Sequence, residues 1–450
     1  MKLNPLGRTG MMVSELCLGT MTFGTQTPEA EAHAQIGRAL EGGVNFVDTA
    51  EMYPVNPVSA ETLGNSERII GNWNAQTGRR GEYILATKHS GAGMQHVRDG
   101  AAISSRTIAP TIEESLRRLK TDYIDLYQFH WPNRGSYMFR QNWSYDPSGQ
   151  NREETLANME DCLEALQREV ARGTIRAFGL SNESAWGTAQ WLRIAQARGG
   201  PRVASIQNEY SLVCRMYDTD LAELSVNEDV GLLAFSPLGT GLLTGKYQDG
   251  AVPEGSRKAI NPELGGRHSP RVYDAVSAYL EIAKRHGLDP VHMALAWCRT
   301  RPFMASAIFG ATHMPQLEHV LKSAELELSQ EVLDEINAAH RAHPMPYGAA
   351  AARGEAPTPL GLMANSPPGY FQPGERDSGF CGGFDRGRSG QCAVGLACSW
   401  RRSRAEVPCA VRKARAKLDC EVKPVAIATS ISGRSVSVTR RRASARRSCR

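Results

Sequence analysis

The sequence predicts an α/β fold, specifically a (β/α)8 TIM barrel, and three observations support this prediction. From Val13 to Leu328, short apolar or β-branched runs alternate with amphipathic stretches of helical length, which is the pattern of a parallel sheet wrapped by helices. Eight such strand–helix units can be counted. An open doubly wound sheet is the alternative, but the glycine-rich segment 239–245 follows the seventh strand and lacks the spacing of a dinucleotide-binding motif. We therefore favour the closed barrel.

The strands are predicted where apolar residues run almost without interruption, because strands of a parallel sheet are buried on both faces. In chain order these are VSELCL (13–18), VNFVD (44–48), YILAT (83–87), IDLYQF (124–129), TIRAFGL (174–180), VASI (203–206), VGLLAF (230–235) and ASAIF (305–309).

Each strand is followed by a segment of helical period. These segments are 29–41, 65–77, 107–120, 153–172, 184–198, 219–228, 270–286 and 314–324, with two extra helices at 290–300 and 329–340. Three helix starts have local signals: Asn65 as a cap, a capping box at Thr111-x-x-Glu114, and Asp289 before Pro290 at a first helical position.

Composition separates the first 347 residues from the rest. The formal net charge is +5, but residues 1–347 carry 33 Lys and Arg against 40 Asp and Glu, whereas residues 348–450 carry 19 against 7. Four single cysteines are spread over the first part, which is typical of a protein of a reducing compartment, so a cytoplasmic location is expected. No apolar run is long enough to span a membrane, and the first twenty residues lack the order of a secretory signal.

The division predicts a barrel over 1–347 and a basic, Cys- and Arg-rich tail over 348–450. In the tail the periodicity stops, and little core could form from its residues. A nucleic-acid-binding arm is one interpretation of the basic charge. We favour a disordered extension or out-of-frame coding, and therefore expect no nucleic-acid partner.

Ionisable residues stand where a barrel places its chemistry, at the carboxyl ends of strands. Asp48 ends the second predicted strand, Tyr53 lies on the loop after it, Lys88 ends the third and His130 ends the fourth. Each alone has an ordinary structural explanation, such as a turn cap or a solvated charge.

Together these four residues suit proton transfer to a carbonyl oxygen. A tyrosine hydroxyl, with a pKa of about 10, needs a nearby cation to stabilise its phenolate. Lys88 can supply the cation, and Asp48 can keep that lysine protonated in a dry pocket. His130 as a neutral imidazole can orient the carbonyl oxygen.

The chain resembles the aldo-keto reductase superfamily over about residues 1–347, and within it the bacterial branch near the potassium-channel β-subunit-like oxidoreductases. The resemblance implies a (β/α)8 barrel that binds an extended nicotinamide dinucleotide without a Rossmann domain. It is carried by LGRTG (6–10), LCLGTMTFG (16–24), GVNFVDTAEMY (43–53), ATKHS (86–90), TDYIDLYQFHWP (121–132), IRAFGLSNES (175–184), IQNEYSL (206–212), FSPLGTGLLTGKY (235–247) and FGATHMPQLEHV (309–320).

The resemblance further implies a catalytic tetrad of Asp48, Tyr53, Lys88 and His130, with Tyr53 as the general acid. The cofactor implied is NADPH, with NADH as the alternative because His313 and Val320 depart from the family's adenosine-binding residues. The residues implied to hold it fall in three groups: Ser181, Asn182 and Gln207 at the nicotinamide amide, with Phe235 stacking on its ring; Ser236, Pro237, Leu238, Gly239, Thr240, Gly241, Leu242 and Lys246 at the pyrophosphate; and Gly310, Ala311, Thr312, His313 and Gln316 at the adenosine.

The predicted function is reduction of a small aldehyde or ketone, with no metal ion. The alternatives are a Schiff-base lyase using Lys88, which Asp48 disfavours; a metal hydrolase, for which His89, His96 and His130 lack paired spacing; and a nicotinamide-binding redox sensor with slow turnover. The aromatic-rich connection 131–152 either walls a substrate pocket or forms a lid or subunit contact. An oligomer is possible.

Overall fold

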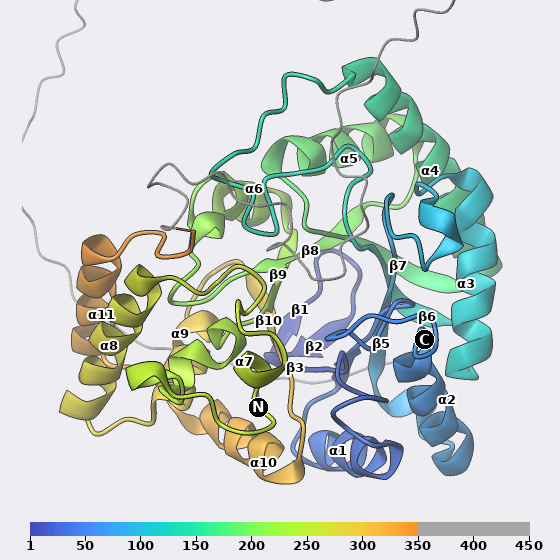
Figure 1. The fold of residues 1–450 in the computed structure, drawn as a ribbon. Coiled ribbons are helices and arrows are strands. Elements are labelled where there is room, and N and C mark those ends of the chain that lie inside the picture. The colour runs from blue at the N-terminus through green and yellow to red at the C-terminus, as the bar shows by residue number, and fades with distance from the viewer. Residues whose placement is uncertain (349–450) are drawn as a thin grey trace, which may run out of the picture. The chain divides into compact units, whose positions relative to one another are not determined.

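The computed structural model describes residues 1–348, and its centre is a closed barrel of eight parallel strands (Figure 1). The predicted tail and its six cysteines lie outside the described residues. The strands follow the order β10-β3-β4-β5-β6-β7-β8-β9 around the barrel. Their bounds are β3 Leu16–Gly19, β4 Phe46–Asp48, β5 Ile84–His89, β6 Ile124–Phe129, β7 Ile175–Ser181, β8 Val203–Glu209, β9 Gly231–Phe235 and β10 Met304–Phe309.

The helices surround the barrel close to the segments that the periodicity predicts (Figure 1). Between β9 and β10, α9 rather than α8 packs on the barrel, and α8 pairs with α11. The helices are α1 Glu29–Glu41, α2 Asn65–Thr77, α3 Ser105–Leu119, α4 Arg152–Arg172, α5 Ala185–Arg198, α6 Asp220–Glu228, α7 Arg257–Ile260, α8 Pro270–Arg285, α9 Pro290–Arg299, α10 Met314–Lys322 and α11 Gln330–Ala342. Within residues 1–348, no helix has the length and apolar character needed to cross a membrane.

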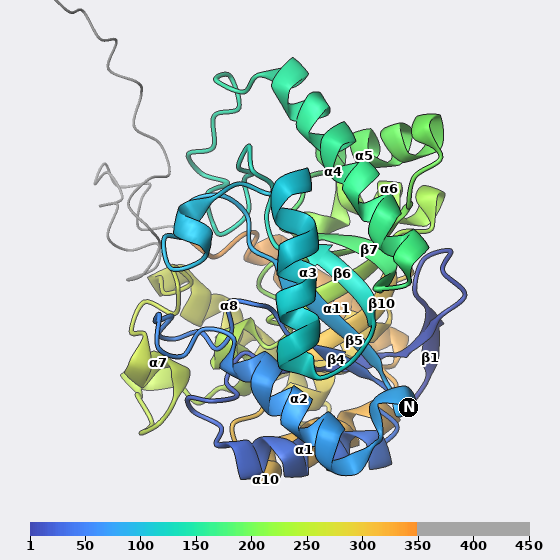
Figure 2. The same ribbon diagram turned by 90° about the vertical axis from the view of Figure 1, so that its right-hand side faces the viewer.

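The first predicted strand, 13–18, is in fact two strands. An antiparallel hairpin of β1 (Leu3–Pro5) and β2 (Met12–Ser14) precedes β3 and lies at one end of the barrel, opposite α7 (Figure 2). Gly7 in its turn has φ +55°, and a Cβ there would lie 2.5 Å from the carbonyl oxygen of Ala204 on β8. The hairpin therefore approaches the barrel too closely for any residue but glycine at this turn.

Helix starts follow the predicted signals in one case of three. Asp289 caps α9 as expected, because its Oδ1 accepts hydrogen bonds from the backbone N–H groups of Val291 and His292 at 2.9 and 3.0 Å. Gly64, not Asn65, precedes α2, and the capping box of α3 is formed by Ser104 and Thr107. The Thr111 pattern lies inside α3, where the backbone N–H groups already have helical partners.

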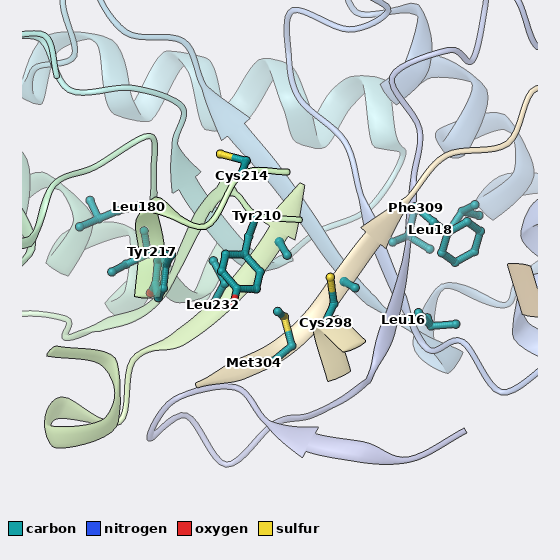
Figure 3. Packing of buried hydrophobic residues seen from close by; sticks show 14 of the residues in the cluster. Leu16, Leu18, Leu180, Tyr210, Cys214, Tyr217, Leu232, Cys298, Met304 and Phe309 are labelled. Atoms are coloured by element: carbon teal, nitrogen blue, oxygen red, sulfur yellow. The ribbon is translucent and has the colours of Figure 1, made fainter. Parts of the chain in front are cut away.

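Two apolar layers stabilise the barrel. The larger lies between the strands and the helices, and Figure 3 shows part of it, with Tyr210, Leu232 and Met304 among its side chains. The smaller fills the barrel interior and includes Leu6 from the hairpin and Phe46 from β4. The hairpin thus completes the inner core at the end where the strands begin.

Candidate active site

A layer of buried polar side chains crosses the barrel interior near the carboxyl ends of the strands. Asp48 is the last residue of β4, Lys88 lies in β5, and Gln128 and Gln207 come from β6 and β8. Lys88 pairs with Gln128 across β5 and β6, and Asp48 pairs with Ala86, which lies two residues before Lys88 on the same face of β5. All four side chains are buried.

Asp48 is the centre of this layer. One carboxylate oxygen, Oδ2, accepts a hydrogen bond from Lys88 Nζ at 2.5 Å. The other, Oδ1, accepts from Gln207 Nε2 at 2.8 Å and from Gln128 Nε2 at 3.1 Å. The carboxylate is therefore fixed from three strands, and it fixes the ammonium in turn.

Lys88 stays charged in a fully buried position. Burial alone would lower its pKa, but the adjacent carboxylate of Asp48 and the hydroxyl of Tyr53 outweigh burial, so the pKa is raised above the usual 10.5. The ammonium also donates to the carbonyl oxygen of Thr49 at 2.7 Å. A raised lysine pKa disfavours the free amine that a Schiff base requires.

Tyr53 lies on the loop after β4, directly beside this ion pair. Its ring centroid is 4.9 Å from Lys88 Nζ, and its ring meets that of His130 edge-on at 5.8 Å. Burial raises the pKa of Tyr53 above its usual 10.0, although the charge on Lys88 opposes that rise. The hydroxyl is thus protonated near neutral pH and has a cation at hand to stabilise the phenolate.

His130 follows β6 and is a neutral imidazole. Burial, and then the charge on Lys88, hold its pKa well below the usual 6.5. Within the described residues, its buried Nδ1 has no hydrogen-bond partner. A neutral ring with an unused polar atom can take part in hydrogen bonding to a ligand.

The three residues predicted at the nicotinamide amide lie next to this group. Ser181 Oγ donates to the carbonyl oxygen of Gln207 at 2.8 Å, and Asn182 Nδ2 donates to the carbonyl oxygen of His130 at 2.9 Å. Oδ1 of Asn182 is buried and has no partner among the described residues. An unsatisfied buried acceptor is costly, and an amide N–H₂ of a ligand would satisfy it.

The segment predicted at the pyrophosphate is a tight turn after β9. Phe235 ends the strand, and positive φ values follow at Ser236, Gly239, Thr240 and Gly241. A Cβ at Gly241 would lie 2.9 Å from Cε of Lys246, whose own side chain is exposed. Turns of successive positive-φ residues can bind an anion through backbone N–H groups, and in this turn the N–H groups of Gly239 and Gly241 already donate to Ser236 and Leu238 at 2.8 and 3.0 Å. Pro237, Leu238 and Leu242 lie within the same segment, with Leu242 buried.

The segment predicted at the adenosine follows β10, the neighbour of β9. Gln316 Oε1 accepts hydrogen bonds from the backbone N–H of Thr312 at 2.8 Å and from its hydroxyl at 3.1 Å. Gly310 begins this segment and His313 precedes α10 with an exposed side chain. Val320 is buried in the core and so does not take the place of a polar adenine ligand.

The sequence prediction did not include Arg257, the first residue of α7. Its buried Nε has no partner among the described residues, and burial, then the like charge of Arg267, lower the pKa of its guanidinium to about 10. Its charge also acts on Tyr53. Arg257 lies in a stretch without clear periodicity, so no sequence signal placed it here.

Gln128 was also missed, although a signal for it exists. It precedes His130 by two residues, and alternate residues of a strand share a face. The aromatic residues of the connection 131–152 fall into two groups. Trp131 lies beside His130, and its ring centroid is 6.3 Å from that of Phe139. Trp143 is exposed, and its indole N–H donates to the carbonyl oxygen of Tyr347 at 3.0 Å.

Comparisons with known proteins agree with this geometry. The aldo/keto reductase family model matches residues 15–341. The chain is 43% identical to Protein tas of Escherichia coli over 77% of this chain and 99% of that protein. It is 31% identical to the uncharacterized oxidoreductase YrpG of Bacillus subtilis, over 74% of this chain and 94% of the relative. It is also 31% identical to a probable voltage-gated potassium channel subunit beta of Arabidopsis thaliana, over 75% and 95%. From the match over most of the barrel, we conclude that the chain belongs to the aldo/keto reductase family, whose members are oxidoreductases of small carbonyl compounds that generally use nicotinamide cofactors.

Proposed function

We propose that the protein reduces an aldehyde or ketone to the alcohol with NADPH, using Tyr53 as the general acid. The observation that carries this proposal is the buried contact of Lys88 with Asp48 at 2.5 Å, with the Tyr53 ring 4.9 Å from the same ammonium. A bound reduced nicotinamide supplies a hydride. The remaining chemistry is proton transfer and charge stabilisation, which these residues provide.

In the reduction, the carbonyl carbon accepts the hydride while the π bond to oxygen breaks. The oxygen takes the proton of the Tyr53 hydroxyl, and the phenolate left behind is stabilised by Lys88 until solvent returns a proton. His130 is neutral, so it can hold the carbonyl oxygen by a hydrogen bond without competing as a stronger acid.

The residues present fit a nicotinamide cofactor. The unpartnered Oδ1 of Asn182 offers an acceptor for the carboxamide, and the turn after β9 and the guanidinium of Arg257 offer donors for the pyrophosphate. We propose NADPH over NADH as an extension of the family resemblance. Dissociation constants for the two cofactors, measured by quenching of tryptophan fluorescence, decide between them.

The test is oxidation of NADPH, followed at 340 nm, with 4-nitrobenzaldehyde and methylglyoxal. Tyr53→Phe should lower kcat by roughly 100- to 10,000-fold, because the general acid is lost while the ring packing is kept. The dissociation constant for NADPH should stay within about twofold. Unchanged aldehyde reduction by Tyr53→Phe would remove Tyr53 from the mechanism.

A redox-sensing subunit is the second candidate, favoured by the similarity to a probable potassium channel subunit beta. The two functions differ in turnover. Tight NADPH binding with negligible oxidation over the whole aldehyde panel would favour the sensor, and rapid oxidation favours the enzyme.

A further inference from the structure

Two arginines share one buried carboxylate above the polar layer. We call this layer, formed by Asp48, Lys88, Gln128 and Gln207, the catalytic layer. Glu209 is the last residue of β8, two positions after Gln207, so both side chains lie on the inward face of the strand and Glu209 is about 7 Å nearer the mouth of the barrel. Arg267 makes a bidentate contact with Glu209, in which Nε donates to Oε1 at 2.6 Å and Nη2 donates to Oε2 at 2.9 Å. Arg140, which lies in the connection 131–152, donates a single hydrogen bond from Nη1 to Oε2 of Glu209 at 3.2 Å.

The pairing leaves positive charge uncompensated. Arg140, Arg267 and Glu209 have side chains at most 8% exposed. The arginines are close together, since a Cβ at Gly265 would lie 3.2 Å from Arg267 Nη1 and 3.7 Å from Arg140 Nη2. Among the described residues, one carboxylate balances one of the two charges, and the second charge stays buried without a counterion.

Of the two arginines, Arg140 uses less of its hydrogen-bonding capacity. Its buried Nε has no hydrogen-bond partner among the described residues. Arg267, in contrast, donates from Nε and Nη2 to Glu209 and from Nη1 to the carbonyl oxygen of Leu264. Burial, and then the charge of Arg267, lower the pKa of Arg140 to about 10, which leaves it charged near neutrality.

Arg140 lies at the same end of the barrel as the residues of the proposed active site. Phe139, its neighbour in the chain, packs in the apolar cluster that also contacts Tyr53 and contains Trp131. Trp131 in turn lies 5.0 Å from the ring of His130. The guanidinium itself is located by its contact with Glu209, which lies on β8 two residues beyond Gln207, and Gln207 donates to Asp48 in the polar layer.

We propose that Arg140 binds an anionic group of the substrate, so that the protein prefers aldehydes or ketones that carry a carboxylate. The inference rests on the proposed function, because it names the substrate class of that same site. Guanidinium and carboxylate match in geometry and charge, and the bound anion supplies the missing counterion. The other source of such an anion is a phosphate of the cofactor.

The test compares 4-carboxybenzaldehyde with methyl 4-formylbenzoate, two aldehydes of similar shape that differ in one negative charge. The full-length protein should have a kcat/KM at least about tenfold higher for the acid. Arg140→Met should reduce this preference by roughly 10- to 100-fold, mainly through KM for the acid, because a hydrogen bond to a charged group is lost. Arg140→Lys should restore part of it.

The variant should fold, because Glu209 keeps both contacts with Arg267. Arg176→Met is the matched control: it also removes one positive charge, but at the start of β7, where Arg176 is paired with Asp125 at 2.8 Å and its side chain is 55% exposed. It should leave the preference unchanged. Calorimetric binding of 4-(hydroxymethyl)benzoate, the product, to the cofactor-bound protein should weaken in Arg140→Met and not in Arg176→Met.

Different failures have different meanings. Equal use of acid and ester, or a preference that survives Arg140→Met, overturns the inference and leaves the proposed reductase intact. A weaker NADPH dissociation constant in Arg140→Met with an unchanged preference overturns it as well, by assigning the arginine to a cofactor phosphate. If neither aldehyde is reduced with either cofactor, the proposed function and this inference both fall.

Discussion

The two ends of the barrel interior differ in what they bury. At the end where the strands begin, the hairpin adds Leu6 to a cluster of buried apolar side chains that includes Phe46 and Leu126. At the end where the strands finish, Asp48 and Lys88 are equally buried but charged. The same closed sheet therefore holds an apolar core at one end and a buried ion pair at the other.

The difference shows how the fold separates stability from chemistry. Burial of apolar side chains is favourable in itself, whereas a buried ion pair must recover the desolvation of both charges through its contacts. Three strands fix Asp48 by hydrogen bonds, so the charged layer depends on a rigid sheet around it. The apolar end supplies that rigidity without taking part in the reaction.

Breaking the ion pair should have the largest effect. Lys88→Met leaves Asp48 buried without its cation, and we expect the free energy of unfolding to fall by about 3–5 kcal/mol. Aldehyde reduction should fall at least about 100-fold, because the phenolate of Tyr53 loses its stabilising charge. Denaturant unfolding and NADPH oxidation measure the two losses.

Lys2→Met is the control for this substitution. Lys2 pairs with Glu327 at 2.9 Å, but both side chains are exposed, so its loss should cost under about 1 kcal/mol and leave the rate unchanged. If Lys88→Met matched Lys2→Met in both measurements, the buried ion pair would not have the role given to it here.

Shortening an apolar side chain at the opposite end of the barrel should lower the free energy of unfolding without changing the rate of reduction. Leu6→Ala removes a fully buried side chain from the inner core and should lower the free energy of unfolding by about 2–5 kcal/mol. Leu3→Ala, in the same hairpin but 50% exposed, should change it by less than about 0.5 kcal/mol. At 25 °C both variants should keep the wild-type kcat, and a large loss of kcat in Leu6→Ala would show that the two ends are coupled.

Much of this contrast could be predicted from the sequence, because it depends on local pattern. Uninterrupted apolar runs located all eight barrel strands, and polar residues at their ends located Asp48, Lys88 and His130. The hairpin was missed because Met12–Ser14 and Leu16–Gly19 read as one apolar run, and only the bend at Glu15 separates them. Periodicity records the burial of a segment but not where its chain direction changes.

The charged groups above the catalytic layer could not be predicted for a different reason. Arg140 and Arg267 come from two connections without regular period, and Glu209 comes from the end of β8, so the three residues are far apart in the sequence. Their convergence depends on how loops fold over the barrel mouth, which neither spacing nor composition encodes. Glu209 alone had a signal, since it follows Gln207 by two residues on a strand.

The smallest effect is expected from pH, and it tests the charged end without a substitution. Tyr53 must be protonated to act as the acid, and its pKa lies above 10, so its active form persists through neutral pH and is lost only as the pH rises past that value. His130 has a pKa well below 6.5, and Lys88 one above 10.5, so neither changes charge near neutrality. The kcat/KM for aldehyde reduction should thus be flat from about pH 7 to 9 and fall above about pH 10. Alcohol oxidation should show the opposite slope, because it needs the phenolate as base. A midpoint near pH 7 in the reduction profile would assign the proton donor to a group other than Tyr53. The charged end of the barrel would then not have the chemical role that distinguishes it from the apolar end.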